Sequence, residues 1–317
     1  MRVAIMGSGG DAPGMNPAIK RFVEYSLERG AEPWFVIDGL EGLIDGDIRP
    51  ASYKDVAGII HRGGAIIGSS RSERFRQRRY RKQAFDQLRK RGIEGLVVLG
   101  GDGSFRAMEI FTGEFDIAAV GIPTTIDNDI YGTDVCLGVD TALEVIKSAT
   151  DNIRDTASTL RRAFVVETMG RECGYLAAVS AITSGAEVCV IPELAFDKER
   201  ATKSLREQLK RGRRYILAIV AEGSRKRDDV ARWLEEDLGM ETRVTVLGHI
   251  QRGGNPSVQD RLLAFGFAVE AVDRVLEKKS GVVGYKRGEF YFYDFRLVSE
   301  NRYEIDPEIL KLLRFLG

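Results

Sequence analysis

Two carboxylates stand close together in the segment GIPTTIDNDIYGTD, which follows an apolar run. Asp127 and Asp129 flank Asn128. In an extended chain, side chains two positions apart project to the same side, so both carboxylates are expected to face one cleft. One could then hold a metal ion while the other accepts a proton from a substrate hydroxyl. A turn with solvated carboxylates is the alternative, and the motif alone leaves the two interpretations about equal.

Two glycine-rich stretches, GSGGDAPGMN (7–16) and LGGDGSFRAM (99–108), each join an apolar run to a helical pattern. Small residues let backbone N–H groups approach an anion, and a helix N-terminus adds partial positive charge. A tight turn would need fewer glycines than the first stretch has. The second stretch contains Asp102, and a carboxylate beside phosphates requires a divalent cation, usually Mg²⁺. Both stretches therefore predict phosphate binding and favour a functional interpretation of the paired aspartates.

Positive charge is concentrated in residues 71–91, which hold ten Lys or Arg. The chain as a whole has 47 basic and 47 acidic residues, so no global field attracts polyanions, and nucleic-acid binding is not favoured. Most of this segment is expected to be a solvated helix face, while Arg71, Arg74 and Arg76 could reach a polyphosphate. In VLGHIQRGGNP (246–256), His249 and Arg252, together with Arg243, could clamp a phosphate monoester.

The elements that must position these residues alternate along the chain. Continuous Val- and Ile-rich runs predict buried strands at 2–6, 33–37, 95–100, 117–122, 163–168, 187–192, 215–220 and 243–247. Helical patterns lie between them. The alternation predicts an α/β fold with two parallel-sheet, doubly wound domains, and ligands bind at the carboxyl ends of such strands.

Two helices can be described in more detail. One carries the stripe Ile19, Phe22, Val23 and Leu27 and is expected to begin with Asn16 as N-cap. The other carries the stripe Leu262, Phe265, Val269, Val272 and Leu276, after a cap-like Asn255-Pro256. The tail predicts a strand over 288–298 and a short helix near 307–315.

Other classes of protein are disfavoured. The three cysteines, Cys136, Cys173 and Cys189, lack CxxC spacing and are expected to be reduced thiols in a cytoplasmic protein. With only two histidines, His61 and His249, a Ser-His-Asp triad or a multi-His metal site is not expected. No apolar run reaches membrane-spanning length, and no membrane partner is predicted.

Seven motifs in one order resemble the bacterial 6-phosphofructokinase family: MGSGGDAPGMN, GGAIIGSSR, GGDGS, TIDND, ETMGRECG, AEG and VTVLGHIQRGGNP. The resemblance extends from Val3 to about Lys278. It implies transfer of the γ-phosphoryl group of ATP, as its Mg²⁺ complex, to the 1-hydroxyl of fructose 6-phosphate. It also implies an active site in the cleft between the domains, and a homotetramer with active sites shared between subunits. The expected domains are 1–138 plus 251–300 for the nucleotide and 139–250 plus 301–317 for the sugar phosphate.

The resemblance also implies a role for each matching position. Asp127 is similar to the general base, and Thr125, Arg71 and Arg171 complete the catalytic set. The implied nucleotide contacts are Gly10, Arg71, Ser72, Arg76, Asp102, Gly103 and Ser104, and the implied metal ligands are Asp102 and Asp129. The implied sugar-phosphate contacts are Thr125, Asp127, Arg162, Met169, Gly170, Arg171, Glu222, Arg243, His249 and Arg252, of which Arg162 and Arg243 come from a neighbouring subunit. The implied contacts of an anionic effector are Lys20, Arg154, Glu187, Arg211, Arg213 and Arg214.

Several positions depart from the family pattern. Gly103 points to ATP, because pyrophosphate-dependent members usually have an acid at this position. At position 124, typical ATP-dependent members have glycine and pyrophosphate-dependent members often have lysine, so Thr124 indicates neither donor. The adenosine side is altered at Ala107, Ser72 and Leu40. Glu24, Tyr53 and Lys54 do not match the effector site, which predicts weak or altered regulation.

A pyrophosphate-dependent phosphofructokinase is the main alternative. A lipid or NAD kinase would explain the GGDG loop but not TIDND or GHIQRGG, and no clean GxGxxG supports an NAD-binding oxidoreductase. A non-catalytic sugar-phosphate-binding subunit is disfavoured because Asp102, Asp127 and Asp129 are all present.

Overall fold

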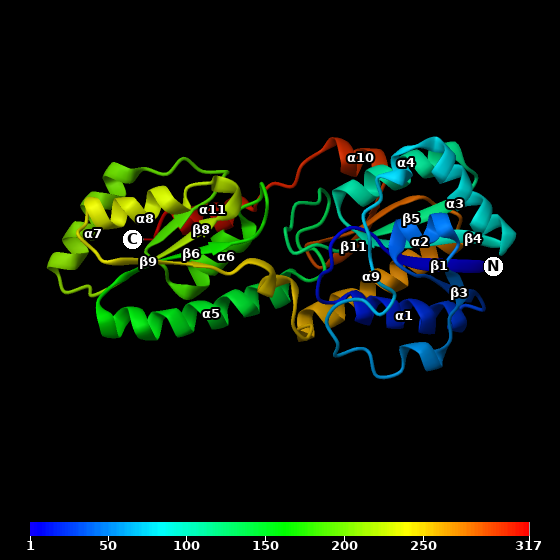
Figure 1. Cartoon of the computed structure of the whole chain (residues 1–317), viewed down its shortest axis with the longest axis horizontal. Helices are drawn as coiled ribbons and strands as arrows, with labels where there is room; N and C mark the ends of the chain where they lie inside the picture. The colour runs from blue at the N-terminus through cyan, green and yellow to red at the C-terminus, as the bar shows by residue number, and fades with distance from the viewer. Residues whose placement is uncertain (317) are drawn as a thin grey trace. The chain divides into compact units, whose positions relative to one another are not determined.

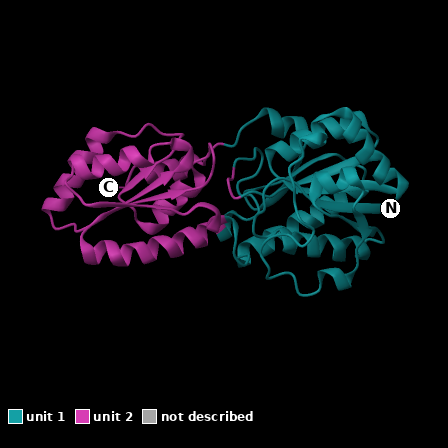
Figure 2. Ribbon diagram, in the orientation of Figure 1, with its two compact units in different colours: residues 1–125, 129–141, 252–303 teal, residues 126–128, 142–251, 304–317 magenta. Residues whose placement is uncertain are grey.

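The computed structural model describes residues 1–316; Gly317, the last residue of the second expected domain, lies outside the described residues. The chain forms two compact units (Figure 2). Unit 1 comprises Met1–Thr125, Asp129–Thr141 and Arg252–Tyr303, and unit 2 comprises Ile126–Asn128, Ala142–Gln251 and the segment from Glu304 onward. The chain therefore passes from one unit to the other several times, twice within the TIDND motif and its neighbours.

Unit 1 contains a seven-stranded sheet in the order β11-β10-β5-β4-β1-β2-β3 (Figure 1). Within residues 1–316, only the two edge pairs of this sheet, β2 with β3 and β10 with β11, are antiparallel. The expected parallel α/β arrangement is confirmed, although β3 and β10 were not predicted. The strands are β1 (Arg2–Gly7), β2 (Glu32–Val36), β3 (Ile48–Pro50), β4 (Ile93–Gly100), β5 (Ala118–Pro123), β10 (Gly281–Lys286) and β11 (Glu289–Tyr293).

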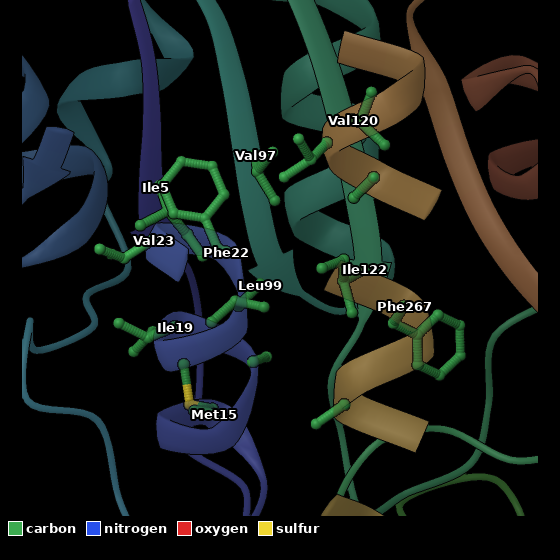
Figure 3. Packing of buried hydrophobic residues seen from close by; sticks show 14 of the residues in the cluster. Ile5, Met15, Ile19, Phe22, Val23, Val97, Leu99, Val120, Ile122 and Phe267 are labelled. Atoms are coloured by element: carbon green, nitrogen blue, oxygen red, sulfur yellow. The ribbon is translucent and has the colours of Figure 1, made fainter. Parts of the chain in front are cut away.

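Helices cover both faces of this sheet. On one face, α1 (Met15–Glu28) and α9 (Val258–Leu276) lie side by side. Figure 3 shows Ile19 and Phe22 of α1 and Phe267 of α9 against the strand residues Leu99 and Ile122. Across the other face lie α2 (Gly39–Asp45), α3 (Arg78–Lys90), α4 (Asp102–Glu114) and α10 (Phe295–Glu300). The 3₁₀ turn η2 (Arg74–Arg76) contacts α2 and α3, whereas η1 (Tyr53–Val56) packs against α1.

A partly buried ion pair fastens α3 to α4. Arg81 donates from Nε and Nη2 to the two carboxylate oxygens of Glu114 at 2.8 and 2.6 Å, and from Nη1 to the carbonyl of Phe75 at 3.0 Å. The hydrogen bond from Arg81 lowers the pKa of Glu114. Part of the basic run at 71–91 is therefore structural instead of a solvated face.

The predicted caps of α1 and α9 are wrong. Helix α1 begins at Met15 after Gly14, whose φ is 96°. The Asn16 side chain instead donates to the carbonyls of Arg62 and Gly63 and accepts from the Ile66 amide, so it ties down the 62–66 loop. Helix α9 starts two residues later than expected, with Ser257 as N-cap accepting from the Asp260 amide.

The predicted buried stripe of α9 is also partly wrong. Leu262 and Phe265 are 66% and 48% exposed, whereas the neighbouring Leu263 and Phe267 are buried. The periodicity was sound, but its phase was shifted because a helix with apolar residues on several faces does not reveal which one is covered. The expected strand over 288–298 ends at Tyr293, and α10 follows.

The N-termini of α5 (Val139–Leu160) and α9 share one carboxylate in unit 1. Asp260, fully buried, accepts from the backbone amides of Gly138 and Thr141, both at 2.8 Å, and from the Thr141 hydroxyl at 2.5 Å. Burial raises the pKa of Asp260, while these three donors oppose the shift. The carboxylate thereby fixes the start of α5 against the start of α9.

Unit 2 contains a parallel four-stranded sheet in the order β7-β8-β6-β9. Val165 and Ala218 on the strands pack with Leu205 of α7 and Trp233 of α8. The elements are β6 (Ala163–Thr168), β7 (Val188–Val190), β8 (Ile216–Ala221), β9 (Thr242–Val246), α5 (Val139–Leu160, whose first turn lies in unit 1), α6 (Tyr175–Ser184), α7 (Lys198–Lys210), α8 (Arg227–Glu236), α11 (Pro307–Leu313), η3 (Glu222–Ser224) and η4 (Gly248–Arg252). None of the helices within residues 1–316 is long and apolar enough to cross a membrane.

Candidate active site

The glycine-rich loop after β1 is held by two other segments of unit 1. The Gly9 amide donates to the carbonyl of Ser70 at 3.1 Å, directly before Arg71. The Ser104 hydroxyl at the start of α4 donates to the carbonyl of Ser8 at 3.1 Å. Three segments that were predicted to bind phosphates therefore meet at the carboxyl ends of β1 and β4, as expected for an open α/β sheet.

Arg252 lies against this loop, within the same unit. A Cβ on Gly10 would come within 2.1 Å of Arg252 Nη1, so a larger residue there would force the guanidinium to move. The arginine side chain is 17% exposed, and its Nη1 lies 3.7 Å from a carboxylate oxygen of Asp11. A residue predicted to hold the sugar phosphate is thus packed beside the loop predicted to hold the nucleotide.

Asp102 is the first residue of α4, and its carboxylate pairs with Arg106 one turn later. Arg106 Nε lies 3.1 Å from Asp102 Oδ2, and the two side chains are 61% and 37% exposed. Arg106 also donates to the carbonyl of Ser299 at 3.3 Å. Sequence reasoning missed Arg106, although its i,i+4 spacing from Asp102 could have indicated the pair. Gly103 is exposed, with open space where a Cβ would be.

The prediction that Arg74 reaches a polyphosphate is not supported, because the guanidinium is engaged elsewhere. It contacts Glu41 and lies 2.7 Å from a carboxylate oxygen of Asp45. Hydrogen bonds from Arg74 lower the pKa of both carboxyl groups. Arg74 therefore fixes the η2 turn to α2, and Arg71, which is exposed, is left as the arginine of this segment best placed for phosphate.

Two more side chains on the nucleotide side are bonded locally. Ser72 Oγ accepts from the Phe75 amide at 3.1 Å and so caps the η2 turn. Arg76 lies 3.1 Å from Glu73, with both side chains about four-fifths exposed, at 78% and 80%. A pair this exposed contributes little and exchanges partners easily.

Thr124 turns back onto the strand that precedes it. It is 2% exposed, its hydroxyl donates to the carbonyl of Ile122 at 3.0 Å, and its amide donates to the carbonyl of Gly100 at 2.9 Å. The residue therefore packs at the end of β5 and does not present its hydroxyl outward.

Asp127 is a buried carboxylate of unit 2. Its side chain is 1% exposed, and Oδ2 lies 3.0 Å from Nε of Arg171, which is 52% exposed. The argument from an extended chain is wrong, because the intervening Asn128 has a φ of 53°, in the left-handed region. Asp129 follows this bend, belongs to unit 1 and is partly exposed.

In the loop after β6, Arg171 has a backbone conformation that residues other than glycine rarely adopt. Gly170 has a φ of 136° and Arg171 a φ of 51°. One oxygen of Glu222, Oε1, accepts from the amides of Gly170 at 3.2 Å and Arg171 at 2.9 Å. The Met169 amide donates to Oε1 of Gln251 at 3.2 Å. Three consecutive amides are thus held by two side chains, and sequence reasoning identified Glu222 but missed Gln251.

Arg162 and Arg243, predicted to act together, are brought together by Glu241. Arg162 Nε lies 2.7 Å from one carboxylate oxygen of Glu241, and Arg243 contacts the other. Both arginines lie where β6 and β9 begin, and Arg243 is 53% exposed. His249 is an exposed residue of η4. Glu241 was not predicted, because it is not part of any recognised motif.

Three of the predicted effector residues in unit 2 lie close together. Arg211, Arg213 and Arg214 line a cavity of about 470 Å³ together with Tyr215. Nε and Nη2 of Arg154 are buried without a hydrogen-bond acceptor among the described residues.

Two carboxylates modify this basic group. Burial raises the pKa of Glu187, although its carboxylate accepts from the Leu217 amide at 2.7 Å and contacts Arg213. Lys20 belongs to unit 1 and pairs with Glu24, the acid whose presence had predicted weak effector binding.

The donors available for a metal are carboxylates. Asp102 and Asp129 are both partly exposed and both belong to unit 1. Mg²⁺ takes oxygen ligands and is usually bound by one or two carboxylates plus substrate phosphates and water. No three His, Cys, Asp or Glu side chains within residues 1–316 form a complete protein cage. The residues present therefore fit Mg²⁺ that arrives with a phosphate.

Comparisons with known proteins agree with this geometry. Residues 2–275 match the family model described as phosphofructokinase. The chain is 54% identical to an ATP-dependent 6-phosphofructokinase of Sulfurimonas denitrificans over 314 residues, which is 98% of each chain. It is 44% identical over 317 residues to the enzyme of the same name from Halalkalibacterium halodurans, covering 100% of this chain and 99% of that protein.

Among solved structures, phosphofructokinase from Saccharomyces cerevisiae is 36% identical with a TM-score of 0.92, over 94% of this chain and 45% of that one. A pyrophosphate-dependent phosphofructokinase from Marinobacter aquaeolei has a TM-score of 0.84 at 19% identity, over 99% of this chain and 91% of that one. At that identity the likeness shows the fold alone.

Proposed function

Because this chain belongs to the phosphofructokinase family, we propose that it transfers the γ-phosphoryl group of ATP to the 1-hydroxyl of fructose 6-phosphate. The products are fructose 1,6-bisphosphate and ADP, and the enzyme is a kinase of glycolysis. The observation that carries the proposal is the buried Asp127 carboxylate facing Arg171 on a braced loop. The names of relatives that match over nearly their whole length support ATP as the donor.

Asp127 acts as the general base. It accepts the proton of the 1-hydroxyl while that oxygen attacks the γ-phosphorus, and the β–γ bridging oxygen leaves with ADP. Arg171 neutralises Asp127 before the substrates arrive. Since the Arg171 side chain is half exposed, it can turn from the carboxylate to the phosphoryl oxygens as negative charge shifts onto them.

The phosphates of the nucleotide lie on the glycine-rich loops of unit 1. Gly10 and Gly103 leave backbone amides accessible, and Arg71 supplies positive charge. Open space at Gly103 suits an α-phosphate, which pyrophosphate lacks. The buried Thr124 likewise offers no cation to a pyrophosphate donor. The sugar phosphate is held by the 169–171 loop, Glu222, His249 and Arg252.

Asp102 and Asp129 would hold Mg²⁺, which supplies charge neutralisation to the phosphate oxygens when bound. To bind Mg²⁺, Asp102 would give up its ion pair with Arg106. That ion pair is largely exposed, so its loss costs about 1 kcal/mol or less.

The phosphate of the sugar is also contacted by Arg162 and Arg243 of a neighbouring subunit, in a homotetramer. In support, Glu241 holds both guanidinium groups where β6 and β9 begin, whereas His249 follows the end of β9. Light scattering tests the tetramer. If active sites are shared, mixing Asp127→Asn with Arg243→Ser subunits restores part of the activity, whereas unshared sites leave the mixture as inactive as its components. The cytoplasmic location stays a prediction.

The arginine-lined cavity binds an anionic effector, such as a nucleoside diphosphate or phosphoenolpyruvate, through Arg211, Arg213 and Arg214. Glu24 of unit 1 places an unmatched carboxylate among the predicted contacts, so regulation is weak. A phosphoenolpyruvate titration that showed strong inhibition relieved by ADP would contradict this.

A donor panel tests the central proposal. Fructose 6-phosphate and Mg²⁺ are supplied with ATP, GTP, ADP or pyrophosphate, and formation of fructose 1,6-bisphosphate is followed. ATP is expected to give the highest kcat/KM. A higher value with pyrophosphate would establish the alternative donor, and no turnover with any donor would indicate a binding protein.

A further inference from the structure

Gln251 joins two segments that were predicted separately to contact the sugar phosphate. Its side chain is fully buried, and it lies in η4, two residues after His249. Oε1 accepts from the Met169 amide at 3.2 Å, and Nε2 donates to the carbonyl of Gly248 at 2.9 Å. One amide group therefore spans the loop after β6 and the turn after β9, both within unit 2.

The loop that Gln251 contacts is one that needs external support. Gly170 and Arg171 have φ angles of 136° and 51°, and an arginine in the left-handed region is strained. Such strain persists only where the surroundings over-determine it. Glu222 accepts hydrogen bonds from the amides of Gly170 and Arg171, and Gln251 accepts one from the amide of Met169, the residue before them.

The other end of Gln251 controls the phosphate-binding turn. Gly248 has a φ of 54° and begins η4, so the hydrogen bond from Gln251 to its carbonyl closes the turn that presents His249. If the Gln251 amide lost this partner, water could not take the partner's place, because the Gln251 side chain is inaccessible to solvent. The two hydrogen bonds thus give the loop and the turn one common position.

We propose that Gln251 is a positioning residue that couples the 6-phosphate subsite to the catalytic loop. Phosphate seated on the η4 turn fixes Gln251, and Gln251 fixes the Met169 amide and hence the backbone that aims Arg171 toward Asp127. Binding energy from the remote phosphate is thereby used to orient the reacting end of the sugar. This inference rests on the proposed function, since it assigns substrate subsites to both segments.

Two variants separate positioning from packing. Gln251→Met keeps the length of the side chain but removes both hydrogen bonds. Gln251→Glu keeps an acceptor for the Met169 amide and sets its second oxygen against the carbonyl of Gly248. Thr202→Val is the matched control, because it removes the 2.9 Å hydrogen bond from Trp233 between α7 and α8 of the same unit, away from the predicted subsites.

For Gln251→Met we expect kcat/KM for fructose 6-phosphate to fall about 10- to 100-fold, as two hydrogen bonds to a preorganised site are lost. Both KM for the sugar phosphate and kcat contribute to this fall, while KM for ATP stays within about twofold. Gln251→Glu should likewise lower kcat/KM for fructose 6-phosphate, because only the bond from the Met169 amide is kept. Thr202→Val should lower the melting temperature about as much as Gln251→Met does, but it should leave the KM values for ATP and fructose 6-phosphate unchanged.

Ligand-induced stabilisation gives a readout that does not need turnover. Fructose 6-phosphate should raise the melting temperature of the wild type and of Thr202→Val, and raise that of Gln251→Met much less. If Gln251→Met is not obtained in folded form, Gln251→Glu decides the question by the same measurements. An unchanged KM for fructose 6-phosphate in the folded variants, or equal losses for both substrates, would overturn the proposal. Failure of the wild type to phosphorylate the sugar would instead overturn the proposed function.

Discussion

Replacing Asp127 by Asn changes the chemistry of the site with the least change in packing. The side chain is 1% exposed, and Asn has nearly the same shape as Asp. The variant loses the proton acceptor and the negative charge opposite Arg171. A positioned base contributes on the order of 10²–10⁴ in rate, equivalent to about 3–5 kcal/mol of activation free energy.

The same substitution should have little effect on folding and on ground-state binding. Burial of the Asp127 carboxylate costs desolvation free energy that offsets much of its attraction to Arg171, so a neutral side chain of the same shape should change stability little. We therefore expect kcat to fall by a factor of about 10²–10⁴, while KM for fructose 6-phosphate changes by roughly threefold or less, since the base acts mainly in the transition state.

Initial rates of ADP release at saturating ATP and Mg²⁺ measure this effect. Asp134→Asn is the control: it is an exposed carboxylate seven residues along that accepts from the Arg287 amide at 2.8 Å, and its loss should leave kcat within about twofold. If Asp127→Asn retained more than a tenth of the wild-type kcat, the assignment of Asp127 as the base would be refuted.

Three further predictions concern the metal, the pH dependence and the junction between helices. Asp129→Asn should raise the Mg²⁺ concentration for half-maximal rate by roughly tenfold or more, and should weaken Mn²⁺ binding measured by electron paramagnetic resonance in the presence of ATP. Glu114→Gln should lower stability by about 1–3 kcal/mol at pH 7. Because Arg81 lowers the pKa of Glu114 below its ordinary value of 4.5, this contribution is present above pH 4.5 and lost as the pH falls through the lowered value, so calorimetry should show the two melting curves converging in acid. Asp260→Asn should cost about 2–4 kcal/mol in urea unfolding, because an amide cannot accept all three bonds from Gly138 and Thr141; a loss below about 1 kcal/mol would contradict that.

The layout of the fold could be predicted from the sequence because buried parallel strands are continuous apolar runs. The eight predicted runs all contain strands, and the polar residues after them lie at the carboxyl ends of the sheets. The strands that escaped, β3 and β10, are an edge strand of three residues and a strand paired with an antiparallel neighbour. Neither has a run of apolar residues long enough to stand out.

Side-chain partners were much harder to predict, because they depend on contacts between distant residues. Asn16 had the sequence pattern of an N-cap, but its amide is used by a loop about 50 positions away. Gln251 lies inside a recognisable motif, yet its partner Met169 is 82 positions distant. The left-handed Asn128 could not be predicted from type alone, and it removed the geometric reason for pairing Asp127 with Asp129.

The charged groups of the candidate site are balanced before any substrate binds. Asp127 faces Arg171, Asp102 faces Arg106, and Glu241 holds Arg162 together with Arg243. The pairs made by Asp102 and Glu241 each have at least one side chain that is more than about one-third exposed, so separating them costs about 1 kcal/mol or less. Asp127 is 1% exposed, so separating it from Arg171 requires a proton or another cation in place of the guanidinium.

Substrate binding then exchanges partners instead of introducing unpaired charges. Phosphate oxygens offer the freed guanidinium groups charge-assisted hydrogen bonds, which contribute about 1.5–3 kcal/mol each. The exchange is favourable for the arginines, whereas the freed carboxylates require a proton or a metal ion. This asymmetry explains why the carboxylates, Asp127 and Asp102, are the groups whose loss should affect turnover and Mg²⁺ dependence most. It also predicts that removing Arg106 alone should strengthen Mg²⁺ binding, because Asp102 then has no competing partner on its own helix.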